Sequence, residues 1–512
     1  MNNFFLAILS GLLLAFSWPA IGIYPLIFVA FVPLLILEKK VKNSKQLFFA
    51  SFLSFFIFNI LTTYWIYYAT PFGAIAAFLV NSFLMAFVFW LFHKIKQLSS
   101  DRWGYFSLIA IWIGMEYFQL QWDLSWPWLT LGNVFASFPI LVQWYEFTGF
   151  LGGSFWVILI NLIFFILYQY DNKKKMIWLL VFSLFFPAII SLYMYFDFKE
   201  VKDGSINILI VQPNVDPYNE KFNLGYQQQL TDLISLVRSE LTQQTNLLLA
   251  PETALVEGIW ENRFEETFSI KAFRDLQDHF PNLNILVGAT TYKVFEHEYQ
   301  RTNTARQIRN ENLFYDAYNS AVFIPDSGNV QVYHKTKLVP GAEKMPFPYL
   351  LDPLARLIVN LGGTSGSLGS ENYLKSFSVD SILVSPLICY ESVYGQMELG
   401  NTNLLAIITN DGWWRETPGY KQHFQYARLR AIEQRKSIIR SANTGISGVI
   451  NARGDVVQAS NWSESVCIGA EVPISNQATF YSVFGDYIGR LCAFIAVLLV
   501  LLSFVKTRLN NL

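Results

Sequence analysis

The chain has 512 residues, of which 53% are hydrophobic and 17% aromatic, whereas only 15% are charged. This composition excludes an ordinary soluble protein of several domains and predicts a membrane protein. The formal net charge of -1 gives no electrostatic footprint for nucleic acid, so we expect no nucleic-acid partner. The cysteines lack the paired spacing of a disulfide framework or a zinc cluster: Cys389, Cys467 and Cys492.

Apolar stretches that approach the roughly 20 residues of a membrane-spanning helix fill the N-terminal part of the chain and recur at its end. They are Phe4 to Ala20, Gly22 to Leu37, Phe48 to Ala69, Phe72 to Phe92, Trp103 to Leu120, Gly152 to Tyr168, Ile177 to Tyr195 and Tyr487 to Val505. The first two are nearly continuous and form either two spans, which we prefer, or one re-entrant hairpin. A cleaved signal peptide is a rival interpretation of the first, but Met1-Asn2-Asn3 lacks a positive n-region.

Positive charges between these stretches alternate along the chain. They follow the second, fourth, sixth and last stretches, as Lys39, Lys40, Lys42 and Lys45, then Lys94, Lys96 and Arg102, then Lys173, Lys174 and Lys175, and finally Lys506 and Arg508. Because lysine and arginine are retained on the cytoplasmic side, the pattern predicts eight spans with both termini inside. The segment before the last span then lies outside the cytoplasm, which predicts a multi-pass protein of the bacterial cytoplasmic (inner) membrane with a periplasmic domain.

That long segment is rich in charged residues and predicts one soluble α/β domain. We expect a membrane domain of about seven helices at 1–197, the α/β domain at 198–485, and a final span with a short cytoplasmic tail at 486–512. The expected strands are Ile206 to Val211, Asn246 to Ala250, Asn284 to Ala289, Ser320 to Ile324, Ile382 to Ile388, Leu404 to Thr409 and Gly445 to Asn451; the expected helices include Gly225 to Gln243 and Gln422 to Lys436. Such apolar strands suit sheets buried on both faces.

Reactive side chains follow three of these β-rich segments. Glu252 comes directly after an apolar strand, where partial desolvation raises a carboxyl pKa toward general-base work. Lys335 is a candidate oxyanion stabiliser, and Glu343 is placed to hold its ammonium. Cys389 follows a strand as a nucleophile elbow does, with the backbone N–H of Tyr390 directed to an oxyanion. Taken singly, each is more often structural.

The three segments together resemble the nitrilase superfamily in order and spacing: Pro251-Glu252-Thr253, the Tyr-x-Lys-x-x-Leu-Val-Pro run around Lys335, and Cys389-Tyr390-Glu391. The resemblance implies an α-β-β-α sandwich. It also implies a triad with Glu252 as general base, Lys335 as oxyanion stabiliser and Cys389 as nucleophile, supported by Glu343, Tyr390 and Glu391. Further similarity lies in Asn410-Asp411-Gly412-Trp413, Gln422-His423-Phe424-Gln425, Ala427 to Glu433 and Arg440 to Ser447.

Ordinary nitrilases are soluble, whereas this domain is flanked by membrane spans, and over nearly the whole chain the arrangement resembles the apolipoprotein N-acyltransferase family. That resemblance implies a phospholipid acyl donor, a thioester on Cys389, and transfer to the α-amine of diacylglyceryl-cysteine in an apolipoprotein acceptor. It implies no metal and no cofactor. As candidate substrate-binding residues we assign Trp413, Trp414, Tyr349 and Leu350, and the apolar runs Tyr349 to Leu351 and Leu357 to Val359 line a lipid path or form buried core.

Other functions remain open at this point. A membrane-tethered amidase of the nitrilase type shares the triad and differs by hydrolysing small amides without lipid. A non-catalytic scaffold would tolerate loss of Cys389. A transporter is disfavoured because the early spans carry few charges, with Glu116 the clearest and equally explained as a paired structural group. We read His334 as structural.

Overall fold

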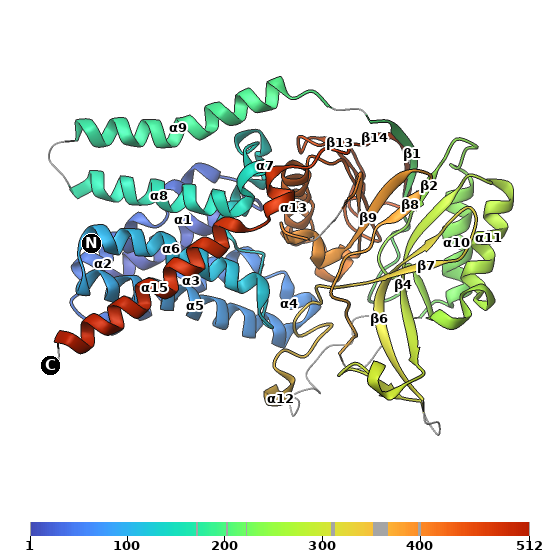
Figure 1. The fold of residues 1–512 in the computed structure, drawn as a ribbon, viewed down its shortest axis with the longest axis horizontal. Coiled ribbons are helices and arrows are strands. Elements are labelled where there is room, and N and C mark those ends of the chain that lie inside the picture. The colour runs from blue at the N-terminus through green and yellow to red at the C-terminus, as the bar shows by residue number, and fades with distance from the viewer. Residues whose placement is uncertain are drawn as a thin grey trace. The chain divides into compact units, whose positions relative to one another are not determined.

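The computed structural model describes residues 2–169, 173–200, 203–221, 223–308, 313–351, 367–397 and 401–510. The chain forms two compact units, each of which is described here by itself (Figure 1). The helical unit comprises Met1–Tyr67, Pro71–Phe198 and Thr479–Leu512. The sandwich unit comprises Tyr68–Thr70 and Lys199–Ala478.

Apolar helices make up the helical unit. Five of its described helices are long and apolar enough to cross a membrane: α3 (Ser44–Thr63), α5 (Pro71–Leu98), α8 (Phe150–Gln169), α9 (Lys174–Asp197) and α15 (Tyr487–Asn510). The other helical elements are α1 (Asn3–Ser17), η1 (Tyr24–Phe28), α2 (Val32–Lys40), α4 (Ile66–Ala69), α6 (Asp101–Gln121), η2 (Leu131–Ser137), η3 (Pro139–Leu141), α7 (Tyr145–Thr148) and α14 (Phe480–Phe484).

The second predicted stretch, Gly22 to Leu37, is not one continuous helix. It is divided into the 3₁₀ turn η1 and the nine-residue helix α2, each with a proline in its first turn. Proline fits the start of a helix but lacks the N–H needed in its interior, so two prolines impose two separate starts. With 15 residues in α1 and nine in α2, each helix is shorter than the roughly 20 residues of a full span.

Glu116 on α6 is buried and hydrogen bonded in the helical unit. Its Oε1 accepts from Trp112 Nε1 at 3.0 Å and from the backbone N–H of Leu131 at 2.9 Å. These bonds tie α6 to the start of η2. They support the structural interpretation of this carboxyl group over a transport site.

Two β-sheets form the sandwich unit. In the larger sheet the strand order is β14 (Val466–Pro473), β1 (Ser205–Gln212), β2 (Leu247–Leu249), β4 (Asn284–Phe295), β6 (Phe314–Ile324) and β5 (Arg306–Gln307), with β3 (Leu255–Trp260) paired to β4 and β7 (Gln331–His334) to β6. In the smaller sheet the order is β13 (Val456–Ala459), β12 (Gly448–Ile450), β11 (Ile438–Ala442), β10 (Leu404–Thr409), β9 (Ile382–Ile388) and β8 (Phe377–Val379).

Side-chain alternation along the strands builds a four-layer sandwich. Ile208 and Ile210 of β1 pack with Ile388 and Ile408 of the smaller sheet in one buried core. The opposite face of the larger sheet packs on α10 (Tyr226–Arg238) and α11 (Phe268–His279), which lie side by side in Figure 1. The outer face of the smaller sheet packs on α13 (Pro418–Gln434). The predicted α-β-β-α sandwich and the predicted apolar helical bundle are both confirmed.

The predicted strands account for part of the two sheets, because β3, β5, β7, β8, β11, β13 and β14 were not predicted. The expected strands at Ile382 to Ile388 and Leu404 to Thr409 match β9 and β10. β4 and β6 run further than expected, as an antiparallel ladder from the Ile285 and Ile324 pair to the Phe295 and Phe314 pair. β11 was missed because Arg440 interrupts its apolar pattern, yet this side chain is fully buried.

Candidate active site

The turn at Cys389 joins the end of β9 to the 3₁₀ turn η7 (Cys389–Val393). Cys389 has a φ of 50°, in the left-handed region that non-glycine residues rarely adopt. In this sharp turn Cys389 lies partly buried at the strand end. Burial raises the pKa of the Cys389 thiol well above its usual value, and the Glu252 carboxylate raises it further while Lys335 opposes the rise. The thiol is therefore protonated at neutral pH and requires a base before it can attack.

Glu252 follows β2 and lies buried in a turn where its neighbour Thr253 also has a positive φ, of 49°. Its Oε1 accepts from Asn319 Nδ2 at 2.7 Å and from Lys335 Nζ at 3.3 Å, and its Oε2 accepts from the Asn410 N–H at 3.1 Å. These donors stabilise a carboxylate in a buried place. An ionised carboxylate is the form that can take a proton.

Lys335 follows β7, and its side chain is only 1% exposed. Its Nζ lies 2.8 Å from Glu343 Oε1 in addition to the contact with Glu252. Burial by itself would lower the pKa of Lys335, but the charges of Glu343 and Glu252 raise it above its usual value. The side chain is thus a permanent ammonium, held in place by two carboxylates as the sequence predicts for Glu343.

Asn319, on β6, connects the two carboxylates and was not identified from the sequence. Its Nδ2 donates to Glu252 Oε1 at 2.7 Å and to Glu343 Oε1 at 2.8 Å, and its backbone oxygen accepts from the Lys335 N–H at 2.9 Å. One side chain therefore fixes the spacing of both carboxylates around the ammonium. The available signal was an asparagine within an apolar strand, a position where a buried amide needs partners.

Glu391 holds the nucleophile turn and the lysine segment together. It is fully buried, and its Oε1 accepts from the Tyr333 hydroxyl at 2.6 Å and from both the N–H and the hydroxyl of Thr336 at 2.7 Å. Its Oε2 accepts from the Ile388 N–H at 2.7 Å. Because Thr336 follows Lys335 and Ile388 precedes Cys389, this carboxyl group sets the position of both chain segments.

A second polar cluster supports the backbone of Cys389. His423 of α13 has Nε2 at 3.1 Å from the Cys389 carbonyl oxygen and Nδ1 at 2.9 Å from Asp411 Oδ1. Arg440 donates to Asp411 Oδ2 at 2.7 Å. Burial opposes ionisation of Asp411, but Arg440 and His423 lower its pKa to about 2. The sequence marked the segments that hold these residues, but not their contact with the nucleophile turn.

Lys221 is a further buried ammonium near the base, in the segment after β1. Its Nζ donates to the Thr253 hydroxyl and lies 5.9 Å from the ring centre of Trp413. Burial lowers the pKa of Lys221 to about 8, against the opposing charge of Glu252. Nothing in its sequence context distinguishes this lysine from a solvated loop residue.

His334, next to Lys335, has the structural surroundings that the sequence predicts. It is buried, with Nε2 at 2.6 Å from Glu261 Oε1 and Nδ1 at 2.9 Å from Glu371 Oε1. Its ring stacks on Tyr318 with 3.9 Å between ring centres. These contacts fix the position of His334 at the end of β7.

The candidate substrate-binding residues fall into different surroundings. Tyr349, in α12 (Pro348–Leu351), is 97% exposed. Trp413 packs edge-on against Tyr218 with 5.7 Å between ring centres, whereas Trp414 is buried against His423. The side chains of Leu350 and Leu351 and the run Leu357 to Val359 lie outside the described residues.

Two family models match the chain, one for each part. Residues 10–163 match the apolipoprotein N-acyltransferase N-terminal domain, and residues 210–476 match the carbon-nitrogen hydrolase family. The hydrolase match spans β1 to β14 and includes Glu252, Lys335 and Cys389. A protein that consists of a carbon-nitrogen hydrolase domain alone would lack the N-terminal match that this chain shows.

Curated relatives cover the chain from end to end. A protein of Chlorobaculum tepidum named apolipoprotein N-acyltransferase is 30% identical over 99% of this chain and 97% of its own length. Proteins with the same name are 25% identical in Geobacter metallireducens, over 100% of this chain and 97% of theirs, and 27% identical in Haemophilus influenzae, over 100% and 98%. On this similarity and the two family matches, the chain belongs to the apolipoprotein N-acyltransferase family.

Proposed function

We propose that the chain transfers an acyl group from a membrane phospholipid to the N-terminal α-amine of a diacylated apolipoprotein, through a thioester on Cys389. The observation that carries the proposal is the contact of Lys335 with Glu252 and Glu343. The charges of Glu252 and Lys335 also act on the thiol of Cys389, in opposite directions on its pKa. A hydrolase domain alone would equally suit an amidase. The match of residues 10–163 to the acyltransferase N-terminal domain favours the acyl transfer.

In the first half-reaction Glu252 takes the thiol proton of Cys389, and the sulfur attacks the ester carbonyl carbon of the phospholipid. The ammonium of Lys335 and the backbone N–H of Tyr390 stabilise the oxyanion that forms. Collapse breaks the carbon–oxygen ester bond, and the leaving alkoxide receives the proton from Glu252. The products are a thioester on Cys389 and a lysophospholipid.

In the second half-reaction the free α-amine attacks the thioester carbonyl carbon. Glu252 accepts a proton from the amine, the carbon–sulfur bond breaks, and the thiolate of Cys389 is protonated again. The product is an amide at the lipoprotein N-terminus. The transferred acyl group comes from the phospholipid. The residues of this chain supply the base, the nucleophile and the hydrogen bonds to the oxyanion.

The direct test is mass spectrometry of a synthetic diacylated lipopeptide incubated with the purified protein and phospholipid. We expect the lipopeptide to gain one acyl chain on its α-amine and an equal amount of lysophospholipid to appear. Release of free fatty acid with an unchanged lipopeptide would contradict the transfer. In a parallel reaction with small amides and no lipid, ammonia release would favour the amidase instead.

We also propose that the catalytic domain, at about 198–485, is periplasmic, between a membrane domain at 1–197 and a final span at 486–512. The alternation of lysines supports this orientation. A reporter that is active only outside the cytoplasm should be active when fused at Asp203 and silent when fused at Leu512. The reverse pair of results would overturn the topology.

A buried glycine gives a separate test of the base position. In Gly288→Ala, the added Cβ would lie 2.5 Å from both the Cα of Glu252 and the carbonyl oxygen of Pro251. These are backbone atoms that cannot rotate away, so we expect the Glu252 turn to shift and the rate of acyl-enzyme formation to fall by up to about 10²-fold. Overpacking should also lower the free energy of unfolding by about 1–3 kcal/mol.

The matched control for Gly288 is Gly469→Ala in β14, because a Cβ there would meet no atom within 4 Å. We expect this variant to keep the parental rate and stability. Acyl-enzyme formation and thermal unfolding are measured for both variants in the same detergent. Equal rates for the two would show that the turn at Glu252 does not depend on this close approach.

A further inference from the structure

The helical unit contains a cavity of about 640 Å³ that the proposed reaction does not use. Its walls come from α6, α8, α9 and α15 and from the short segment around α7. Apolar side chains dominate the lining, including Phe106, Leu159 and Phe186. The volume lies within the range of about 300–1,000 Å³ that is typical of small-molecule sites.

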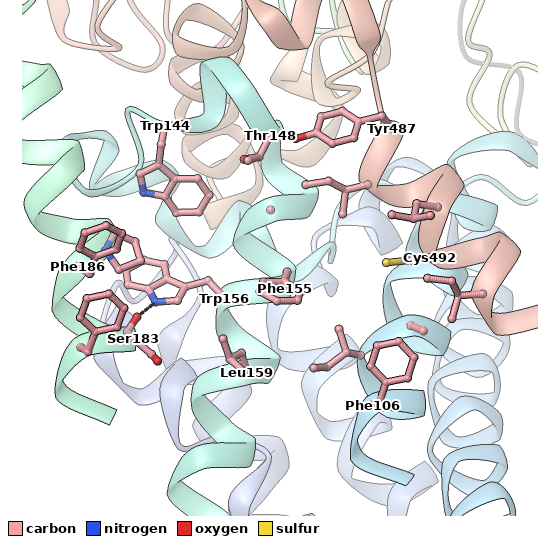
Figure 2. A pocket seen from close by; sticks show the side chains of 18 residues that line it. Phe106, Trp144, Thr148, Phe155, Trp156, Leu159, Ser183, Phe186, Tyr487 and Cys492 are labelled. Carbon is pink, nitrogen blue, oxygen red and sulfur yellow. Dashed lines mark hydrogen bonds between the residues drawn. The ribbon is translucent and has the colours of Figure 1, made fainter. Parts of the chain in front are cut away.

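Polar groups gather at one end of this cavity. Figure 2 shows Trp144, Thr148 and Tyr487 at that end, while Leu159 and Phe106 lie at the other. This polar end is near the first residues of α8 and α15, and the apolar end is further along those helices. The wall of the cavity is thus apolar over most of its length, with three of its few polar side chains at this end.

One donor at the polar end lacks a partner. Trp144 Nε1 is buried and has no hydrogen-bond acceptor among the described residues. By contrast, the neighbouring indole of Trp156 donates to the backbone oxygen of Ser183 at 2.8 Å (Figure 2). Because a buried N–H without an acceptor is costly and uncommon, the unpaired indole calls for an acceptor that the described chain does not supply.

The flanks of the cavity are apolar and exposed. Phe182 and Phe186 of α9 and Leu491 of α15 line the cavity and are also exposed side chains. Both helices are long and apolar enough to cross a membrane, so the medium on these flanks is the hydrocarbon of the bilayer. An acyl chain can then enter the cavity laterally from the bilayer. Water is disfavoured there because the apolar wall offers it few hydrogen-bond partners.

We propose that this cavity binds one acyl chain of a membrane phospholipid, with the adjacent ester carbonyl accepting a hydrogen bond from Trp144 Nε1. The chain runs toward Leu159 and Phe106, and the ester lies beside Thr148 and Tyr487. All residues of this site belong to the helical unit, whereas Glu252, Lys335 and Cys389 belong to the sandwich unit. The bound lipid packs between α9 and α15, and we assign it a structural role separate from that of the acyl donor.

The test is photochemical cross-linking in the Cys389→Ser variant, in which no acyl-enzyme forms, so that the result does not depend on turnover. The protein is placed in phosphatidylethanolamine nanodiscs that contain a small fraction of the same lipid with a diazirine at the end of one acyl chain. After irradiation, the labelled residues are identified by peptide mass spectrometry. We expect labels concentrated on the apolar end, at Leu159, Phe106 and their neighbours in the lining.

Two substitutions and a control sharpen the test. Ser183→Phe fills the cavity from α9 and should remove most of the cavity labelling, whereas Ile189→Phe on the same helix, outside the lining and exposed, should leave it unchanged. Trp144→Phe keeps a ring but removes the donor, and should lower retention of the lipid through delipidating washes by about fivefold.

Three results would overturn the proposal. The first is labelling spread evenly over the exposed faces of α9 and α15. The second is unchanged cavity labelling in a Ser183→Phe protein that unfolds at the parental temperature. The third is equal labelling by a long-chain alkane that carries the diazirine but no ester, because the indole N–H would then have no role in recognition.

Discussion

Replacement of Cys389 by serine is expected to abolish both thioester formation and acyl transfer, with a loss on the order of 10⁴-fold or more. The hydroxyl of serine is far less acidic than the thiol, and the surroundings of Cys389 already disfavour the anion, since burial and Glu252 raise the pKa of the thiol. A carboxylate at Glu252 then has too little driving force to deprotonate the hydroxyl. Only the nucleophile changes, because the left-handed turn and its supports remain.

The matched control for Cys389 is Cys467→Ser. Cys467 lies in β14 with its Sγ 3.7 Å from the Leu236 carbonyl oxygen, in the core between the larger sheet and its helices. We expect this variant to transfer acyl chains at nearly the parental rate. The measurement is phospholipid-dependent mass gain on the intact protein, followed by transfer to the lipopeptide. Substantial transfer by Cys389→Ser would rule out Cys389 as the nucleophile.

Loss of the Lys335 ammonium is expected to slow acylation by about 10²- to 10³-fold, whereas loss of the Lys337 ammonium should have nearly no effect. The two lysines are two residues apart in the chain, so the period of an extended segment places them on one face and does not choose between them. The structure distinguishes them. Lys335 contacts Glu252 and Glu343, while Lys337 Nζ lies 5.3 Å from the ring centre of Tyr394.

Lys335→Ala also leaves two buried carboxylates without their shared cation, so its stability should fall by about 3–5 kcal/mol. Acylation rates are therefore compared at a temperature where thermal unfolding shows each variant to be folded. An inactive Lys337→Ala beside an active Lys335→Ala would reverse the assignment. If Lys335→Ala unfolds at a lower temperature but keeps the parental acylation rate while folded, the role of this lysine is structural and not catalytic.

Glu252 and Cys389 could be proposed from the sequence because each follows an apolar strand that is easy to recognise. Glu252 follows the three leucines of β2 after two further residues, and Cys389 comes directly after β9, an apolar strand that contains Ser385. The resemblance to a family then chooses which lysine to assign. Pattern and resemblance together were sufficient to predict the two-sheet fold, and they also led to the residues that we propose for catalysis.

The residues that hold these groups in place were harder to predict, because their partners are distant in the chain. Asn319 acts through contacts to Glu252 and Glu343, 67 and 24 residues away. Arg440 interrupts an apolar pattern, and its contacts with Asp411, 29 residues before it, and with the Ile446 carbonyl oxygen explain a charge inside β11. Periodicity describes neighbours along one segment, so contacts of this range appear only once the sheets are assembled.

The ends of the helices were also harder to predict than their presence. The hydrophobicity averaged over a stretch of residues does not indicate where a helix begins. For that reason Gly22 to Leu37 was assigned as one span. The prolines that start η1 and α2 divide it. Composition therefore predicts which segments enter the bilayer more securely than it predicts how many complete crossings they make.

Glu391 links activity to correct folding. Its carboxyl group receives hydrogen bonds from Tyr333 and Thr336, at the end of a strand in the larger sheet, and from Ile388, in the smaller sheet. A chain in which only one sheet has formed cannot satisfy both sets of donors. In a partly assembled protein the segment after Lys335 and the turn at Cys389 are therefore not held together, so the ammonium and the thiol lack a fixed spacing.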